Sequence, residues 1–260
     1  GLIMADRRRG IYLLPNLFTT SALFAGFYAI IAAIDGRFEA AAIAVFVAMV
    51  LDGMDGRIDR LTNTQSDFGV QYDSLSDLIS FGLAPSLLVY QWSLFNLGKL
   101  GWSAAFIYAA AAALRLARFN TQATIEDKRY FQGLASPAAA ALIAGMVWLG
   151  DSHGLSDNRL AVIFSLPITV IAGALMVSNI RYHSFKKFDL KGRVPFVAVM
   201  VVVLIFFLFS SNPPLILASV ALIYAVSGPV ITLLALRKHR AARKPEDPAL
   251  SKQDTPAKDP

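Results

Sequence analysis

Aspartates are concentrated in one short stretch of the chain, residues 51–77. Asp52 and Asp55 are three positions apart, and Asp73 and Asp77 are four positions apart. Either spacing puts two carboxylates on one face of a helix, and a helical hairpin would bring the two pairs together. Oxygen donors without His or Cys favour hard divalent cations such as Mg²⁺, Mn²⁺ or Ca²⁺. Two such ions, about 3.5–4 Å apart, can clamp a phosphoryl group during its transfer.

The same carboxylates also suit a proton relay or a cation- or proton-coupled transporter, because such proteins need acidic residues inside the membrane. Transporter sites usually lie near the bilayer midplane. Here the neighbours of the cluster favour phosphate chemistry. Gly56 and Gly69 allow backbone to come close to a ligand, Arg57 and Arg60 can hold phosphate oxygens, and Ser66 can donate another hydrogen bond.

The composition predicts that membrane helices carry these residues. Of the 260 residues, 56% are hydrophobic and 16% are charged, whereas a soluble domain has roughly 25% charged residues. A spanning helix needs about 20 apolar residues, which predicts eight spans at 13–34, 38–58, 71–93, 102–120, 134–150, 159–179, 194–211 and 214–236. Residues 13–236 then form a transmembrane catalytic domain, between a cytoplasmic segment at 1–12 and a mobile charged tail at 237–260.

The basic residues predict the orientation of these helices. All but three of the 24 Lys and Arg residues fall on one side of the eight-helix arrangement, the exceptions being Arg37, Lys99 and Arg159. Such an excess marks the cytoplasmic side. We therefore expect an inner-membrane protein with both termini and the aspartates at the cytoplasmic face, and no nucleic-acid partner despite the net charge of +6. The absence of cysteine excludes disulfides, thiolate catalysis and zinc–thiolate sites.

The acidic stretch resembles the signature of the CDP-alcohol phosphotransferases at seven positions: Asp52, Asp55, Gly56, Arg60, Gly69, Asp73 and Asp77. These membrane enzymes transfer a phosphatidyl or related group from a CDP-linked donor to an alcohol and release CMP. The resemblance implies an all-α polytopic membrane protein, usually a homodimer, with a six-helix core and here two further C-terminal helices. It also implies two divalent cations, Mg²⁺ or Mn²⁺ with Ca²⁺ as another occupant, in a cavity open to the cytosol.

The resemblance implies roles for individual residues. The cation ligands would be Asp52, Asp55, Asp73 and Asp77, and Asp77 would also be the general base. Contacts with the CDP part would come from Gly56, Arg60, Ser66 and Gly69. The segment PNLFTT resembles the family's Pro-Asn-x-x-Thr element, which implies further donor contacts from Pro15, Asn16, Leu17, Phe18 and Thr19.

Asp59 is a departure from the signature, because the family has Ala immediately before its Arg. Its carboxylate would add negative charge beside an anionic donor, and we expect it to lower turnover. It could also join the cation site or pair with Arg57 or Arg60. A non-catalytic lipid-binding protein, disabled by Asp59, is a further alternative.

Four other segments resemble the membrane-embedded phosphatidylserine synthases: DLISFGLAPSLLVY, LRLARFN, YFQGLASPAAA and VSNIRYHSFKKFDLKGRVPF. Ala135 departs from their pattern, in which a proline is expected. This resemblance implies CDP-diacylglycerol as donor and L-serine as acceptor, with membrane lipids as partners. The serine carboxylate needs a cation, and the candidates on the cytoplasmic side are Arg115, Arg118, Lys128, Arg129, Lys186 and Lys187. Basic residues would equally suit glycerol 3-phosphate or inositol phosphate, so the acceptor, including inositol, stays open on the residues alone.

Overall fold

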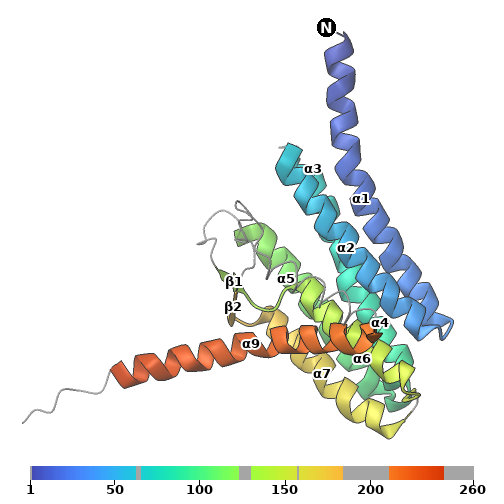
Figure 1. Ribbon diagram of the computed structural model, residues 1–260, viewed down its shortest axis with the longest axis vertical. Helices are drawn as coiled ribbons and strands as arrows, with labels where there is room; N and C mark the ends of the chain where they lie inside the picture. The colour runs from blue at the N-terminus through green and yellow to red at the C-terminus, as the bar shows by residue number, and fades with distance from the viewer. Residues whose placement is uncertain (1, 63–65, 123–129, 157, 184–210, 243–260) are drawn as a thin grey trace, which may run out of the picture.

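The computed structural model describes residues 2–62, 66–122, 130–156, 158–183 and 211–242, and these residues are almost entirely helical (Figure 1). The first half of the chain forms α1 (Leu2–Ile34), α2 (Phe38–Thr62), α3 (Asp67–Asp77), η1 (Leu78–Leu83), α4 (Ala84–Val89), η2 (Tyr90–Leu94) and η3 (Phe95–Leu97). The second half forms α5 (Lys99–Gln122), β1 (Tyr130–Gln132), α6 (Ser136–Ser152), α7 (Arg159–Val177), β2 (Arg181–His183) and α9 (Pro213–Ala242). The predicted all-α class is therefore confirmed.

Within the described residues, five helical segments are long and apolar enough to cross a membrane. They cover Leu17–Ile34, Asp67–Leu97, Lys99–Thr121, Arg159–Val177 and Pro213–Arg237. This confirms a polytopic membrane protein. Two further predicted spans correspond to α2, which carries the charged residues of the acidic stretch at its end, and to α6, which has 17 residues. Nearly all of the predicted span 194–211 lies outside the described residues, so the total of eight stays a prediction.

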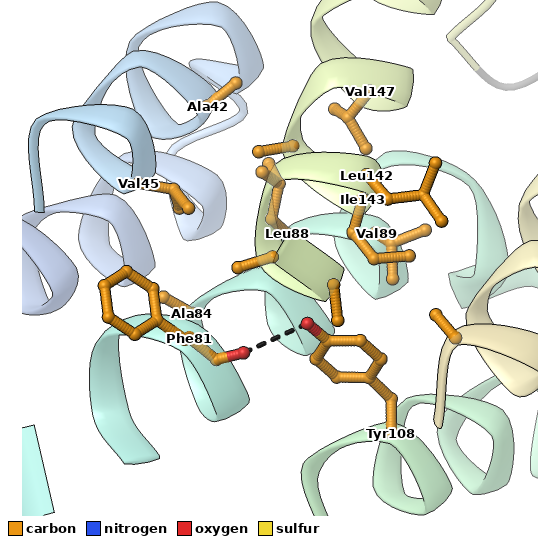
Figure 2. Close-up of a cluster of buried hydrophobic side chains, with 14 of the residues drawn as sticks. Ala42, Val45, Phe81, Ala84, Leu88, Val89, Tyr108, Leu142, Ile143 and Val147 are labelled. Carbon is orange, nitrogen blue, oxygen red and sulfur yellow. Dashed lines mark hydrogen bonds between the residues drawn. The ribbon is translucent and has the colours of Figure 1, made fainter. Parts of the chain in front are cut away.

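Small side chains allow the helices to approach one another closely. α1 lies along α2 as an antiparallel hairpin (Figure 1), and both helices carry buried alanines: Ala25, Ala29, Ala32, Ala33, Ala41, Ala42 and Ala48. Small residues have this role in membrane helix pairs, where backbone contact replaces the hydrophobic effect. Larger side chains fill the centre between α4, α5 and α6, among them Leu88, Tyr108 and Ile143 (Figure 2).

The third predicted span is one continuous helical segment, but it is not a uniform α-helix. It runs from Asp67 to Leu97 and contains two π-helical turns, η1 and η2. The hydrophobic pattern predicted neither turn, since periodicity does not reveal a local change of hydrogen-bond register. The first π-helical turn begins directly after Asp77, so it lies next to the acidic residues.

Two features of the second half of the chain were not predicted. β1 and β2 pair antiparallel, with Tyr130 opposite His183 and Gln132 opposite Arg181. Strands of three residues are too short to show a period of two in the sequence. In addition, α9 crosses the other helices at a steep angle (Figure 1) and packs on α6. Gly145 permits this contact, because a Cβ at that position would lie 2.9 Å from the Cα of Ala218.

Candidate metal and nucleotide site

Three of the four predicted cation ligands form a compact cluster. Asp52 lies on α2, and Asp73 and Asp77 lie one turn apart on α3. One carboxylate oxygen from each of them lies within 4.8 Å of the others, and all three side chains are half-buried. Three carboxylates this close repel one another unless a proton or a cation compensates them. The oxygen-only donor set therefore fits a hard divalent cation.

Asp55 lies beside this cluster in a different environment. Its side chain is 3% exposed, and its Oδ2 accepts a hydrogen bond from the hydroxyl of Thr19 on α1. Asp55 is also close enough to Asp77 for their charges to interact. The structure thus brings Asp55 to the edge of the cluster, with one oxygen engaged by α1, and its predicted role as a cation ligand stays a prediction.

Helix α1 is the third wall of the site, and two serines attach it to the acid-bearing segment. Ser76 donates to the carbonyl of Thr19 and Ser80 donates to the carbonyl of Ala22, both at 3.1 Å. Gly26 makes the approach possible, because a Cβ there would overlap with Ser80 Oγ and would lie 2.7 Å from Ser80 Cα. Thr19 consequently contacts both helices: its hydroxyl bonds Asp55 on α2, and its carbonyl accepts from Ser76 on α3.

Several of the predicted nucleotide contacts have local structural roles. Ser66 is the N-cap of α3, and its side chain accepts a 3.0 Å hydrogen bond from the N–H of Gly69. An accepting hydroxyl can still donate its own proton, so the cap does not preclude a ligand contact. Gly56 follows Asp55 on the exposed side of α2. Leu17 is exposed and Phe18 is half-buried, so among the described side chains of this element Thr19 alone is buried.

The two described basic residues from the predicted acceptor set face the β-strands. Arg115 Nη1 donates to the carbonyl of Gln132 at 2.9 Å. Arg118 donates to Gln132 Oε1 and, at 2.8 Å, to Asn179 Oδ1. Arg115 therefore links α5 to β1, and Arg118 links α5 to β1 and to the segment before β2. Among the residues that the structure describes, no carboxylate lies within ion-pair distance of Arg115.

Several predicted site residues lie outside the part of the chain that the structure describes. Lys128, Arg129, Lys186 and Lys187 lie outside the described residues. Pro15 and Asn16 belong to α1, and Asp59 and Arg60 belong to α2, but the side chains of these four residues also lie outside what the structure describes.

Sequence reasoning missed the residues that connect α1 to the acid-bearing segment. Besides Ser76 and Ser80, these include Thr20 and Tyr72, whose hydroxyl oxygens lie 2.8 Å apart. Ser76 and Ser80 are four positions apart, as Asp73 and Asp77 are, and this spacing could have predicted a polar helix face. The partner helix was not readable, because the partners of both serines are backbone carbonyls, which every residue has.

Comparison with known proteins agrees with this geometry. The sequence profile of the CDP-alcohol phosphatidyltransferase family matches residues 12–171. A Helicobacter pylori protein named CDP-diacylglycerol–serine O-phosphatidyltransferase is 43% identical over 177 residues, which cover 68% of this chain and 74% of the relative. Proteins of the same name from Methanocaldococcus jannaschii and Bacillus subtilis are 37% and 33% identical, over 54% and 67% of this chain and 62% and 92% of the relatives.

The matched region contains α2, α3 and the acidic cluster, and it also contains the PNLFTT element of α1. This match favours phosphoryl-transfer chemistry over the transporter alternative, since the acidic residues lie where the family signature requires them. Together, the clustered carboxylates, the predicted signature and the profile match show that the chain belongs to the CDP-alcohol phosphatidyltransferase family.

Proposed function

We propose that the protein transfers the phosphatidyl group of CDP-diacylglycerol to the hydroxyl of L-serine, giving phosphatidylserine and CMP. The observation that carries this proposal is the cluster of Asp52, Asp73 and Asp77 beside the element PNLFTT of α1, in a chain whose relatives are named for this reaction. The serine oxygen forms a new bond to the β-phosphorus, and the bond from that phosphorus to the oxygen of CMP breaks. CMP leaves with the electron pair.

Asp52, Asp73 and Asp77 are the proposed ligands of divalent cations, Mg²⁺ or Mn²⁺, and Asp55 is the fourth proposed ligand. Their carboxylates offer the oxygen donors that such ions prefer, and three of them already lie within 4.8 Å of one another. When bound, the cations supply charge neutralisation for the donor's diphosphate and for the departing phosphate of CMP. The predicted donor contacts, Gly56, Arg60, Ser66, Gly69 and residues 15–19, are part of this proposal.

Asp77 is the proposed general base, which takes the proton from the serine hydroxyl as that oxygen attacks. A neutral hydroxyl is a weak nucleophile, and a positioned base typically gives about 10²–10⁴-fold. Asp77 lies at the end of α3, where the π-helical turn begins, and its side chain is half-buried. Attack in a single step fits the described residues, which offer no paired nucleophile and base of the Ser–His type at this site.

Arg115 is the proposed partner of the serine carboxylate. α5 runs antiparallel to the acid-bearing segment and touches it at two levels, where Tyr108 bonds Phe81 and where Asn120 bonds Ser74. Arg115 lies between Tyr108 and Asn120, as Asp77 lies between Ser74 and Phe81. Both residues therefore belong to the stretch over which α5 and the acid-bearing segment are in contact, with the Arg115 guanidinium group on the carbonyl of Gln132. Arg118, Lys128 and Arg129 complete the proposed basic side.

We further propose that the site faces the cytoplasm in the inner membrane and that the protein is a homodimer. The orientation rests on the one-sided distribution of Lys and Arg, and the dimer rests on the family resemblance. A protease-accessibility assay on the C-terminal tail, and mass determination in detergent, test these two statements separately.

An acceptor panel tests the reaction. Purified protein is supplied with CDP-diacylglycerol and Mg²⁺ or Mn²⁺, and CMP release is measured with serine, glycerol 3-phosphate, inositol or inositol phosphate. We expect release with serine and none with the other acceptors, and an Asp77→Asn variant should lose about 10²–10⁴-fold of the rate. Release with another acceptor alone would reassign the substrate. Donor binding without any CMP release would support the non-catalytic lipid-binding alternative.

A further inference from the structure

The π-helical turn that follows Asp77 has an identifiable cause in the sequence. In an α-helix, each carbonyl accepts from the N–H four residues later. For the carbonyl of Phe81 that residue is Pro85, which has no N–H and whose ring also crowds the carbonyl four positions before it. The chain avoids this conflict by widening the turn, so that the N–H of Ala84 reaches back five residues to the carbonyl of Ile79.

A tyrosine from another helix supplies a donor to the carbonyl that Pro85 cannot serve. Tyr108 on α5 is fully buried, and its hydroxyl donates to the carbonyl of Phe81 at 3.0 Å (Figure 2). A carbonyl buried without a donor would cost the free energy of its lost hydration. Gly82 allows α5 to come this close, because a Cβ there would meet the Cβ of Ala112 at 3.1 Å.

The widened turn determines the direction of the acidic residues. Phe81 within the turn, and Ala84 and Leu88 beyond it, anchor the segment in the core, and all three are 0% exposed (Figure 2). Each residue of an α-helix adds about 100° of rotation. If the turn returned to an α-helix, the part before it would rotate by up to that amount relative to the anchored part. Asp73 and Asp77 would then point away from Asp52.

We propose that Tyr108 is a positioning residue of the cation site: by donating to the Phe81 carbonyl, to which Pro85 cannot donate, it holds the π-helical turn that directs Asp73 and Asp77 toward Asp52. This inference rests on the proposed function, since it takes the cluster to be a cation site. Tyr108 touches neither substrate nor cation. Tyr108 instead raises the fraction of molecules in which the three carboxylates point toward one another. The apparent affinity for the cation is proportional to that fraction.

Mn²⁺ binding to the purified full-length protein, followed by electron paramagnetic resonance, tests this inference without relying on activity. Tyr108→Phe removes only the hydroxyl, and we expect it to raise the Mn²⁺ dissociation constant about tenfold. Tyr182→Phe is the matched control, because Tyr182 is also fully buried and also donates to a backbone carbonyl, that of Ala225, at 2.9 Å. The control should lose similar thermal stability and bind Mn²⁺ within about twofold of the wild type.

A second variant approaches the same turn from the proline. Pro85→Ala supplies the missing N–H and removes the reason for the wide turn, so it should also weaken Mn²⁺ binding. Tyr108→Phe should then raise the Mn²⁺ dissociation constant by a smaller factor in the Pro85→Ala background than in the wild type. The two effects are not additive, because both residues act on the carbonyl of Phe81.

The outcomes distinguish the role of Tyr108 from the proposed cation site. Suppose that the wild-type protein binds Mn²⁺ and that Tyr108→Phe and Pro85→Ala have the same Mn²⁺ dissociation constant as the wild type. This result would overturn the role of Tyr108 and leave the proposed function unaffected. Equal weakening in Tyr108→Phe and Tyr182→Phe would overturn it as well, since it would show a general loss of stability. Wild-type protein that binds no Mn²⁺ would overturn the cation site and this inference together.

Discussion

Gly26→Ala should separate α1 from the acid-bearing segment and thereby disable the site. The new Cβ would lie 2.7 Å from Ser80 Cα and 2.9 Å from Ser80 Cβ. Ordinary contacts between carbon atoms are about 3.5–4.0 Å, so the two helices must move apart by about 1 Å. Rotation of a side chain cannot relieve the overlap, because one of the atoms belongs to the backbone.

That displacement reaches the carboxylates through hydrogen bonds already described. Ser80 and Ser76 would withdraw from the carbonyls of Ala22 and Thr19, and the hydroxyl of Thr19 would withdraw from Asp55. Overpacking of a core contact typically costs about 1–3 kcal/mol of stability. A misplacement of about 1 Å in a catalytic constellation can cost about 10²-fold in rate. We therefore expect CMP release to fall about 100-fold, while the folded protein persists.

Gly145→Ala is the matched control for this variant. Its Cβ would also overlap with backbone, at 2.9 Å from the Cα of Ala218, but at the contact of α6 with α9. No predicted site residue lies on either of these helices. Thermal unfolding in detergent and CMP release with serine should be measured for both variants. We expect comparable losses of stability, with a rate within about threefold of the wild type for Gly145→Ala.

Two results would refute the reasoning. If Gly26→Ala and Gly145→Ala lose activity equally, the effect of Gly26 is a general loss of stability and not a displacement at the site. If Gly26→Ala retains the wild-type rate, the contacts of α1 with Ser76 and Ser80 do not position the carboxylates.

Four other variants and treatments test the same site. Chelation with EDTA should abolish CMP release and lower the unfolding temperature, because a ligand at 100 times its dissociation constant adds about 2.7 kcal/mol of stability. Added Mg²⁺ or Mn²⁺ should restore the activity and the unfolding temperature. Activity that persists in EDTA would contradict a cation requirement. Thr19→Val removes the hydrogen bond to Asp55 and should weaken Mn²⁺ binding about tenfold, whereas Ser21→Ala, which loses only a bond to its own helix, should bind normally. Arg115→Gln should raise the KM for serine at least tenfold with little change in the KM for the donor, and equal changes in both would argue against a serine contact. Asp59→Ala should raise turnover by removing a negative charge near the donor, and an unchanged rate would show that this carboxylate is neutral in effect.

Helical periodicity predicted most of the acidic cluster. The spacings of Asp52 and Asp55, and of Asp73 and Asp77, put each pair on one face of its helix, and the structure brings Asp52, Asp73 and Asp77 together. The all-α class followed from the apolar composition in the same direct way. The different surroundings of Asp55 were not predictable, since they depend on Thr19, a residue 36 positions away in the sequence.

Long-range contacts account for most of what the sequence did not reveal. The bonds from Ser76 and Ser80 reach across 57 and 58 positions to backbone carbonyls of α1, and a backbone acceptor leaves no trace in residue type. The wide turn after Asp77 follows from Pro85, which is visible in the sequence. Whether such a proline produces a kink, a break or a π-helical turn depends on which group donates to the carbonyl of Phe81. That partner, Tyr108, comes from a later helix.

Thr19 contacts α2 through its hydroxyl and α3 through its carbonyl. In the proposed function, α1 would therefore couple the binding of the nucleotide to the binding of the cations. A nucleotide that draws α1 inward would improve the arrangement of carboxylates on both α2 and α3. Cations that draw those carboxylates together would, by the same contacts, favour the position of α1 that the nucleotide prefers. Cooperativity of this kind is reciprocal, so each ligand must raise the affinity for the other by the same factor, whichever of them arrives first.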